Sequence, residues 1–125
     1  MTSFVHLHVH SHFSFMDGVA SPDELLSCAV GYGMKALALT DHQGLYGAIR
    51  FYRAAQATGV KPIVGTEVVV EPAGIDGCEG DLPPHARLPL SAPVGFGRAR
   101  GAGFHLTLLA KDITGYRNLC RLLSR

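Results

Sequence analysis

The chain opens with apolar and imidazole side chains in alternation over residues 4–10, FVHLHVH. Val5, Leu7 and Val9 fall on one side of this period of two, and the histidines fall on the other. Such a period predicts a strand with one apolar face and one face of imidazoles. The side chains on the imidazole side are Phe4, His6, His8 and His10.

Capping residues and helical spacing predict three helices. The first begins at Ser21-Pro22-Asp23-Glu24, which combines an N-cap, a proline in the first turn and the glutamate of a capping box. Gly33 is expected to end that helix, and a second helix is predicted over residues 46–58. A third is predicted over residues 116–124, capped by Thr114. The expected buried stripes comprise Leu25, Leu26, Ala29 and Val30, then Ile49, Tyr52 and Ala55, with Cys28 and Cys120 packed in the core.

Continuous apolar runs predict three further strands, over residues 36–40, 62–70 and 104–110. Unbroken runs of this length are typical of strands that are buried on both faces of a parallel sheet. With the helices between them, the order β-α-β-α-β-loop-β-α predicts an α/β fold built by right-handed crossovers. Chemistry in such folds gathers at the carboxyl ends of the strands.

Residues 71–103 interrupt this pattern with seven glycines and five prolines in 33 residues. A stretch of this length and composition is either a functional loop or a disordered insert, and disorder is favoured.

Composition narrows the class of protein. The 125 residues suit one domain, and 11 basic against 10 acidic side chains argue against an electrostatic nucleic-acid clamp within this segment. Its longest apolar stretches fall far short of the ~18 residues of a membrane span, and the first ten residues carry no export signal. Three widely spaced cysteines fit a reduced compartment. We therefore expect a cytoplasmic protein without a membrane partner.

Histidines provide the first candidate chemistry, because four of the seven occur within the first twelve positions. On a strand, His8 and His10 would lie on one face, ~6.6 Å apart along the backbone. Two imidazoles at that separation can converge on one metal ion. The alternative is a solvated edge strand whose histidines bind nothing. His12 and His85 are assigned no ligand role.

Other candidate ligands lie at or near strand ends. Asp17 is either a ligand or an ordinary turn residue before glycine. Asp41-His42 ends an apolar strand, where the ring can bind a metal and the carboxylate can orient ligands. Glu67 lies within an apolar strand, where burial is costly unless a cation pairs with it, and a salt bridge is the alternative. His105 taken alone is more typical of a core histidine.

A cluster of His, Asp and Glu without cysteine ligands suits two or three divalent ions. Sites of this kind hydrolyse phosphate esters by activating water and holding the attacking and leaving oxygens. The chain carries no HExxH, GxSxG, Walker or Rossmann signature that would support another reaction class.

The motifs HLHVHS at 6–11, Asp17-Gly18 and LTDH at 39–42 resemble the first two motifs of the PHP (polymerase and histidinol phosphatase) superfamily. Longer stretches are similar to the amino-terminal PHP domain of bacterial DNA polymerase III alpha subunits of the DnaE type, error-prone relatives included. These are FSFMDGVASPDEL, ALALTDHQGLYGAIRFYRAAQATGVKPIVGTEV and HLTLLAKDITGYRNLCRLLS.

The resemblance implies a distorted (β/α)7 barrel with a metal cluster, commonly of three ions, at its mouth. His6 stands where many relatives have aspartate, so His6 and Asp41 are expected to support the ligands rather than bind ions. The metal is expected to be Mn, Zn or Fe. The ligand positions that the resemblance carries over are His8, His10, Asp17, His42, Glu67 and His105.

The family also takes ligands from later strands, and only about four of its βα units are found here. We therefore expect an α/β fold that is an incomplete (β/α)7 PHP barrel. Residues 1–125 would be its N-terminal part, with an insert at about 72–103.

The resemblance further implies a fragment of a polymerase whose PHP site hydrolyses phosphodiesters, plausibly as a 3′–5′ proofreading exonuclease. Its expected partners are a DNA 3′ end and other replisome subunits. The carboxylates that add nucleotides are absent from the chain, so whether this segment is an enzyme by itself stays open. The alternatives are a stand-alone phosphatase and a non-catalytic structural module.

Overall fold

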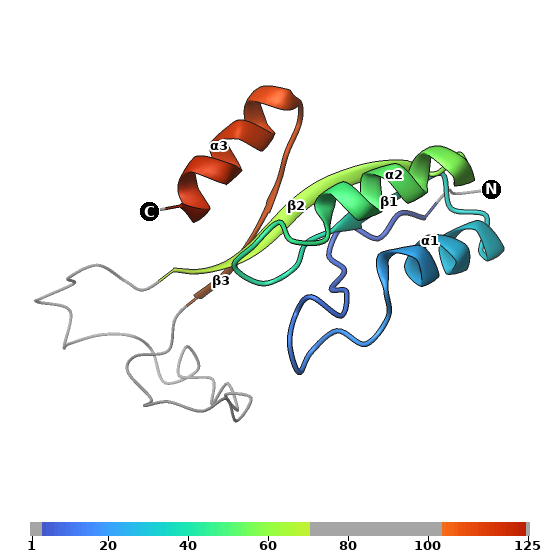
Figure 1. Ribbon diagram of the computed structural model, residues 1–125, viewed down its shortest axis with the longest axis horizontal. Helices are drawn as coiled ribbons and strands as arrows, with labels where there is room; N and C mark the ends of the chain where they lie inside the picture. Colours follow the sequence, from blue (N-terminus) through green and yellow to red (C-terminus); the bar gives the residue numbers. More distant parts are fainter. Residues whose placement is uncertain (1–3, 71–103, 125) are drawn as a thin grey trace, which may run out of the picture. The chain divides into compact units, whose positions relative to one another are not determined.

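The computed structural model describes residues 4–70 and 104–124, and the expected insert lies outside them (Figure 1). The chain divides into two units, one of residues 1–68 and 106–125 and the other of residues 69–105. The second unit contributes only the adjoining ends of two strands to the described residues. The elements are α1 (Pro22–Gly31), β1 (Ala36–Leu39), α2 (Ala48–Thr58), β2 (Lys61–Val70), β3 (Phe104–Leu109) and α3 (Ile113–Leu123).

The described strands form one sheet in the order β1-β2-β3. β1 and β2 are parallel, as predicted, with Ala36 opposite Lys61 and Leu39 opposite Val64. α2 connects them, as expected of a crossover between parallel strands. The apolar runs at 36–40 and 62–70 therefore gave the correct elements and the correct relative direction.

β3 departs from the predicted all-parallel sheet. The Ala110 N–H donates to the Val64 carbonyl at 2.8 Å, and Gly65 lies close against the carbonyl of Leu108. Position 64 therefore lies near 110 and position 65 near 108, so residue numbers rise along β2 while they fall along β3. Such a pair of strands is antiparallel. Antiparallel neighbours need no crossover helix between them, and the sequence between β2 and β3 predicts none.

Residues 4–10, expected to be a regular strand, form an extended segment bonded to β1. The Ala38 N–H donates to the His6 carbonyl and the Thr40 N–H to the Val9 carbonyl, at 2.9 and 2.8 Å. Between these two bonds the segment advances three residues while β1 advances two. This extra residue breaks the ladder as a bulge does, and it breaks the alternation, so Leu7 is 49 % exposed.

The capping box predicted for α1 is present. The Ser21 hydroxyl accepts the Glu24 N–H, and the Glu24 carboxylate accepts the Ser21 N–H at 2.7 Å. The hydrogen bond from the Ser21 N–H to the Glu24 carboxylate, and then that from the Ser21 hydroxyl, lower the pKa of Glu24. α1 ends at Gly31 with Tyr32 as its C-cap, just before the left-handed Gly33 that was expected to end it.

The buried faces of the helices differ from the predicted stripes. α2 buries Ala48, Phe51 and Ala55, whereas Ile49 and Tyr52 are exposed. Both series have helical spacing, and the position of the sheet selects the one that contains Phe51. In α1, Leu26 and Ala29 are buried as predicted, but Val30 and Cys28 are exposed, so Cys28 is not a core residue. The core cluster comprises Leu26, Ala29, Leu37, Leu39, Phe51, Ala55 and Val60.

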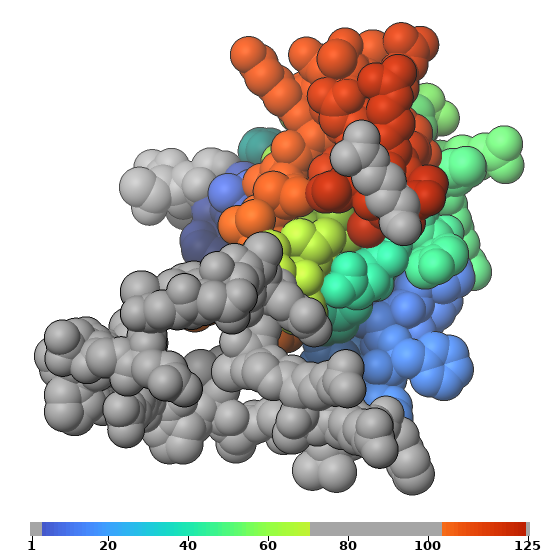
Figure 2. Space-filling model, turned by 90° about the vertical axis from the view of Figure 1, so that its left-hand side faces the viewer, coloured from blue at the N-terminus to red at the C-terminus, as the bar shows by residue number. Residues whose placement is uncertain are grey.

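Figure 2 shows the side chains of α3 beside those of α2. A cavity of about 600 Å³ lies between these helices and the start of β2, lined by Ile49, Tyr52 and Tyr116 among others. None of the predicted ligands is among the described residues that line it. In the part of the chain that the structure describes, no helix has the length and apolar character needed to cross a membrane.

α3 begins earlier than predicted, at Ile113, and Thr114 is not its cap. Asp112 is the N-cap, and its carboxylate accepts the Gly115 N–H at 2.9 Å. Asp and Thr are both common caps, so residue type alone did not separate the two positions. Of the expected core residues here, Cys120 is partly buried, and Leu119 is the buried member of the helix.

Replacing the cap tests this correction. We expect Asp112→Ala to destabilise the first turn of α3 by about 1 kcal/mol, because the Gly115 N–H loses its acceptor. Thr114→Ala is the matched control and should change stability by less than about 0.5 kcal/mol. Hydrogen exchange at the Gly115 amide in the full-length protein measures both effects. Faster exchange in Thr114→Ala than in Asp112→Ala would restore Thr114 as the cap.

Candidate metal centre

The register of β1 and β2 brings two of the predicted ligands together. The parallel pairing continues beyond β1 as an isolated bridge between His42 and Glu67. The Glu67 N–H donates to the Asp41 carbonyl at 3.1 Å, and the Gln43 N–H donates to the Glu67 carbonyl at 2.8 Å. Gln43 has a φ of 50°, so the chain turns away from the sheet directly after His42.

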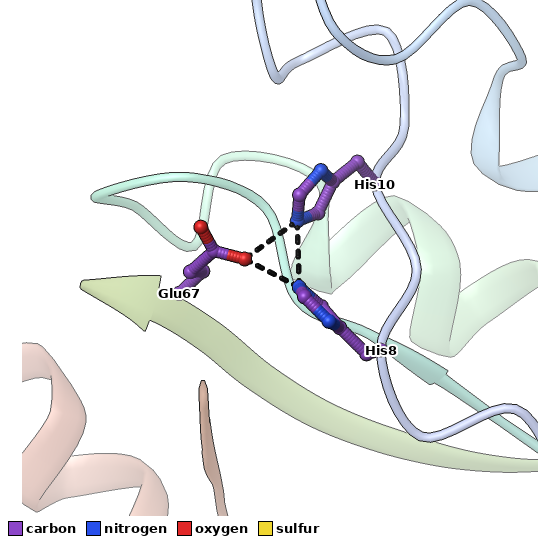
Figure 3. A group of neighbouring side chains, drawn as sticks. All are labelled: His8, His10 and Glu67. Atoms are coloured by element: carbon purple, nitrogen blue, oxygen red, sulfur yellow. Dashed lines mark hydrogen bonds and ion pairs between the residues drawn. The ribbon is translucent and has the colours of Figure 1, made fainter. Parts of the chain in front are cut away.

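Three side chains form the first group of candidate ligands (Figure 3). His8 Nε2 and His10 Nε2 are 3.1 Å apart, and His10 Nε2 is 3.2 Å from Glu67 Oε2. His8 Nε2 also contacts Glu67 Oε2. Ligand atoms around a tetrahedral ion with bonds of ~2.0–2.1 Å lie ~3.3 Å from one another. Two of the three separations match this spacing, and the convergence of two imidazole nitrogens with one carboxylate oxygen fits a divalent ion.

Burial of Glu67 strengthens this interpretation. Its side chain is 3 % exposed, and its second oxygen, Oε1, lies 3.2 Å from His42 Nδ1. A buried carboxylate is costly unless positive charge and hydrogen bonds compensate it. Three imidazoles face this one carboxylate, His8 and His10 at Oε2 and His42 at Oε1. Neutral imidazoles and a carboxylate are the donor set that a divalent transition metal prefers.

Asp17 forms a second group with His10 and His42. Asp17 Oδ2 contacts His10 Nδ1 and lies 2.9 Å from His42 Nε2. The hydrogen bond from His42, and then that from His10, lowers the pKa of the Asp17 carboxyl. His10 therefore presents Nε2 to the first group and Nδ1 to Asp17. Metal-binding histidines commonly donate their other N–H to a carboxylate in this way.

A tight turn positions Asp17. The N–H groups of Asp17 and Gly18 both donate to the Ser14 carbonyl, at 3.0 and 2.9 Å. Met16 adopts a left-handed backbone with a φ of 65°. A Cβ atom at Gly18 would lie 1.8 Å from the Ser11 carbonyl oxygen, so glycine is required there. The Asp-Gly pair is thus both a turn and a support for the carboxylate.

Two further predicted site residues, His6 and Asp41, make other contacts. The His6 ring packs edge-on against Phe4 at 4.6 Å. Asp41 is 2 % exposed, and its carboxylate bonds to Ser11 and Ser14 rather than to an imidazole. His105 lies on β3 in the second unit, and its role as a ligand stays a prediction. The structure brings together His8, His10, Asp17, His42 and Glu67.

Sequence reasoning missed the two buried serines. Ser11 and Ser14 are 0 % and 1 % exposed. Serine is common in loops, and no spacing rule marks it as a partner of a carboxylate 27 or 30 positions away. The only available signal was their position between the His-x-His pair and Asp17.

An α/β sheet with imidazoles and carboxylates converging beside its strands defines the class: a domain that binds divalent metal ions. The model of the PHP domain family matches residues 6–125, so the chain belongs to the PHP family. The resemblance drawn from its motifs is thereby confirmed.

Curated relatives specify the branch of the family. The chain is 43 % identical over 122 residues to the error-prone DNA polymerase of Symbiobacterium thermophilum, covering 98 % of this chain and 8 % of that protein. It is 44 % identical over 129 residues to the DNA polymerase III subunit alpha of Thermus aquaticus, covering 98 % and 9 %. The chain is thus homologous to a PHP segment of these polymerases and spans about a tenth of their length or less.

Solved structures agree on the fold. A candidate metal-dependent phosphoesterase from Bifidobacterium adolescentis is 28 % identical, with a TM-score of 0.51 over 54 % of this chain and 23 % of its own. An amidohydrolase from Chromobacterium violaceum is 24 % identical, with a TM-score of 0.56 over 94 % of this chain and 32 % of its own. The second likeness concerns the fold alone. The prediction of an α/β fold is confirmed, while the incomplete barrel stays a prediction.

Filling the space at Gly18 tests the turn. We expect Gly18→Ala to lower the free energy of unfolding by about 1–3 kcal/mol, because main-chain atoms of Ser11 must move. Gly31→Ala is the matched control, since a Cβ at Gly31 meets no atom within 4 Å. That variant should be neutral or more stable by up to about 1 kcal/mol. Urea unfolding measures both, and equal stability of the two variants would contradict the close packing of the turn.

Proposed function

We propose that this PHP domain is a metal-dependent phosphoesterase centre that hydrolyses phosphodiesters. In the polymerase of which it would be part, it would act as a 3′–5′ exonuclease on the DNA 3′ end. The observation that carries the proposal is the convergence of His8, His10 and Glu67 on one point beside the sheet. The names of the polymerase relatives support the DNA substrate, and the phosphoesterase neighbour supports the reaction class.

The two oxygens of Glu67 face different candidate ligands. Oε2 of Glu67 faces His8 and His10, while Oε1 faces His42. The first ion would be held by His8, His10 and Glu67, and a second by Asp17 and His42, whose Nε2 faces Asp17 while its Nδ1 faces Glu67. We further propose His105 as a ligand, which gives two or three ions of Mn, Zn or Fe. When bound, such ions activate water and stabilise the charge on phosphoryl oxygens.

The side chains also fix protons at stated atoms. His10 presents Nε2 to the first group, so its proton lies on Nδ1, where the Asp17 carboxylate accepts it. That bond holds the ring in the tautomer and orientation that leave the Nε2 lone pair available. Asp17 thus has two functions in the proposal, as orienting partner of His10 and as ligand beside His42.

Substrate and partners follow from the charge of the chain and from its relatives. A net charge of +1 provides no strongly basic surface for DNA. We therefore propose that other parts of the longer protein hold the DNA 3′ end at this centre. Other replisome subunits are the further proposed partners, and the cytoplasm is the proposed location. The three widely spaced cysteines support that location.

Removing two ligands tests the proposal. In the full-length protein, His8→Ala combined with His10→Ala should lower the metal content by at least one ion per chain. It should also slow the exonuclease on single-stranded DNA by more than about 100-fold, because Glu67 alone cannot hold the first ion. His12→Ala is the control, since its ring packs against Phe13 and belongs to neither ligand group. Metal analysis and exonuclease rates provide the two measurements.

Other results would point to other functions. Unchanged metal content and exonuclease rate in the double variant would contradict the site. Hydrolysis of para-nitrophenyl phosphate without any action on single-stranded DNA would favour a small-molecule phosphatase. A protein that binds no metal but still associates with a polymerase core would favour a non-catalytic module.

A further inference from the structure

A buried cluster of hydroxyl groups joins the loop that carries Asp17 to the strand end that carries His42. Ser11, Ser14 and Asp41 are each 2 % exposed or less. Asp41 Oδ1 accepts the Ser11 N–H and the Ser14 hydroxyl, both at 2.7 Å, and Asp41 Oδ2 accepts the Ser11 hydroxyl at 2.9 Å. Among the described residues, the Asp41 carboxylate therefore bonds to Ser11 and Ser14 of the loop and not to the side chain of a candidate ligand.

Ser14 is the centre of this cluster. Its hydroxyl donates to Asp41 Oδ1 and accepts the backbone N–H of His42 at 3.1 Å. Its carbonyl accepts the N–H groups of Asp17 and Gly18. A hydroxyl has one proton to donate, so both directions are fixed: towards the carboxylate as donor and from the amide as acceptor. Ser14 thereby bonds to the backbone of two candidate ligands, Asp17 and His42, that lie 25 positions apart in the sequence.

Thr40 has the corresponding role for the segment that carries His8 and His10. Its hydroxyl accepts the Val9 N–H at 2.9 Å and donates to the Val9 carbonyl at 3.1 Å. Val9 lies between His8 and His10, so this pair of bonds holds the segment that supplies the first ligand group. Thr40 is also fully buried. One buried hydroxyl thus serves each group.

We infer that Ser14 is a positioning residue that sets the geometry of the Asp17–His42 pair separately from that of the His8–His10–Glu67 group. The inference rests on the proposed function and adds that each ligand group is supported by its own buried hydroxyl. Without the Ser14 hydroxyl, the partly buried His42 N–H loses its acceptor and the buried Asp41 Oδ1 loses a donor. Unsatisfied buried groups favour rearrangement of the backbone, which would move the ring and the carboxylate apart. Metal sites lose affinity when their supporting contacts are removed.

Titration of the full-length protein with Mn²⁺ alone, monitored by calorimetry, tests whether each ligand group depends on its own hydroxyl. The binding step that disappears in Asp17→Asn identifies the ion of the second group, and the step that disappears in His8→Ala identifies that of the first. We expect Ser14→Ala to weaken the Asp17-dependent step about tenfold or more and the His8-dependent step, which shares His10, by a clearly smaller factor. Thr40→Val, which removes a hydroxyl at nearly constant volume, should produce the opposite pattern.

Thermal unfolding separates positioning from a merely structural role. Equal weakening of both steps in Ser14→Ala, or a lower unfolding temperature with both steps unchanged, would overturn the inference. If Ser14→Ala does not fold, Ser14→Cys decides, because a thiol of similar size is a weaker hydrogen-bonding group. It should weaken the Asp17-dependent step selectively, and an unchanged step would overturn the inference. If neither His8→Ala nor Asp17→Asn alters Mn²⁺ binding, the proposed function itself fails.

Discussion

The parallel register of β1 and β2 is the constraint on which the rest of the site depends. Each residue of β1 lies opposite the residue 25 positions later, and the bridge between His42 and Glu67 keeps that offset beyond the end of β1. Side chains alternate between faces along a strand, so a slip of one residue would turn Glu67 away from the imidazoles. The crossover through α2 and the burial of Phe51 against the sheet stabilise this register.

Two buried carboxylates, Asp41 and Glu67, belong to neighbouring segments joined by a backbone hydrogen bond, and the fold satisfies them differently. Asp41 is surrounded by hydroxyl and backbone N–H groups, which donate hydrogen bonds to both of its carboxylate oxygens. Glu67 is surrounded by imidazoles that can equally bind an ion. Burial strengthens both sets of contacts, because a low dielectric makes each of them stronger than in water. The first carboxylate organises the loop, and the second is available for chemistry.

Local signals predicted most of the elements and only part of their packing. Ser21 and Glu24 formed the expected capping box, because both partners lie within one turn. The buried face of α2 was wrong, since Ile49 and Tyr52 repeat as regularly as the residues that are buried. The direction of β3 was also wrong, because direction depends on which edge of the sheet a strand reaches. Asp112 replaced the expected cap of α3 because Asp and Thr are both common caps and residue type did not separate the two positions.

The sequence by itself determined the chemistry of this protein. The His-x-His pair, an acidic residue before glycine, an Asp-His pair after an apolar run and a glutamate within one specify ligand types, and their order specifies the PHP family. Only the tertiary structure decided which atoms meet. It assigned one oxygen of Glu67 to His8 and His10, the other oxygen to His42, and one nitrogen of His10 to Asp17. It also buried Ser14 between the loop that carries Asp17 and the strand end that carries His42. Apart from the pair His10–Asp17, which is 7 positions apart, those contacts join segments 25 to 59 positions apart, a separation that periodicity and capping rules do not reach.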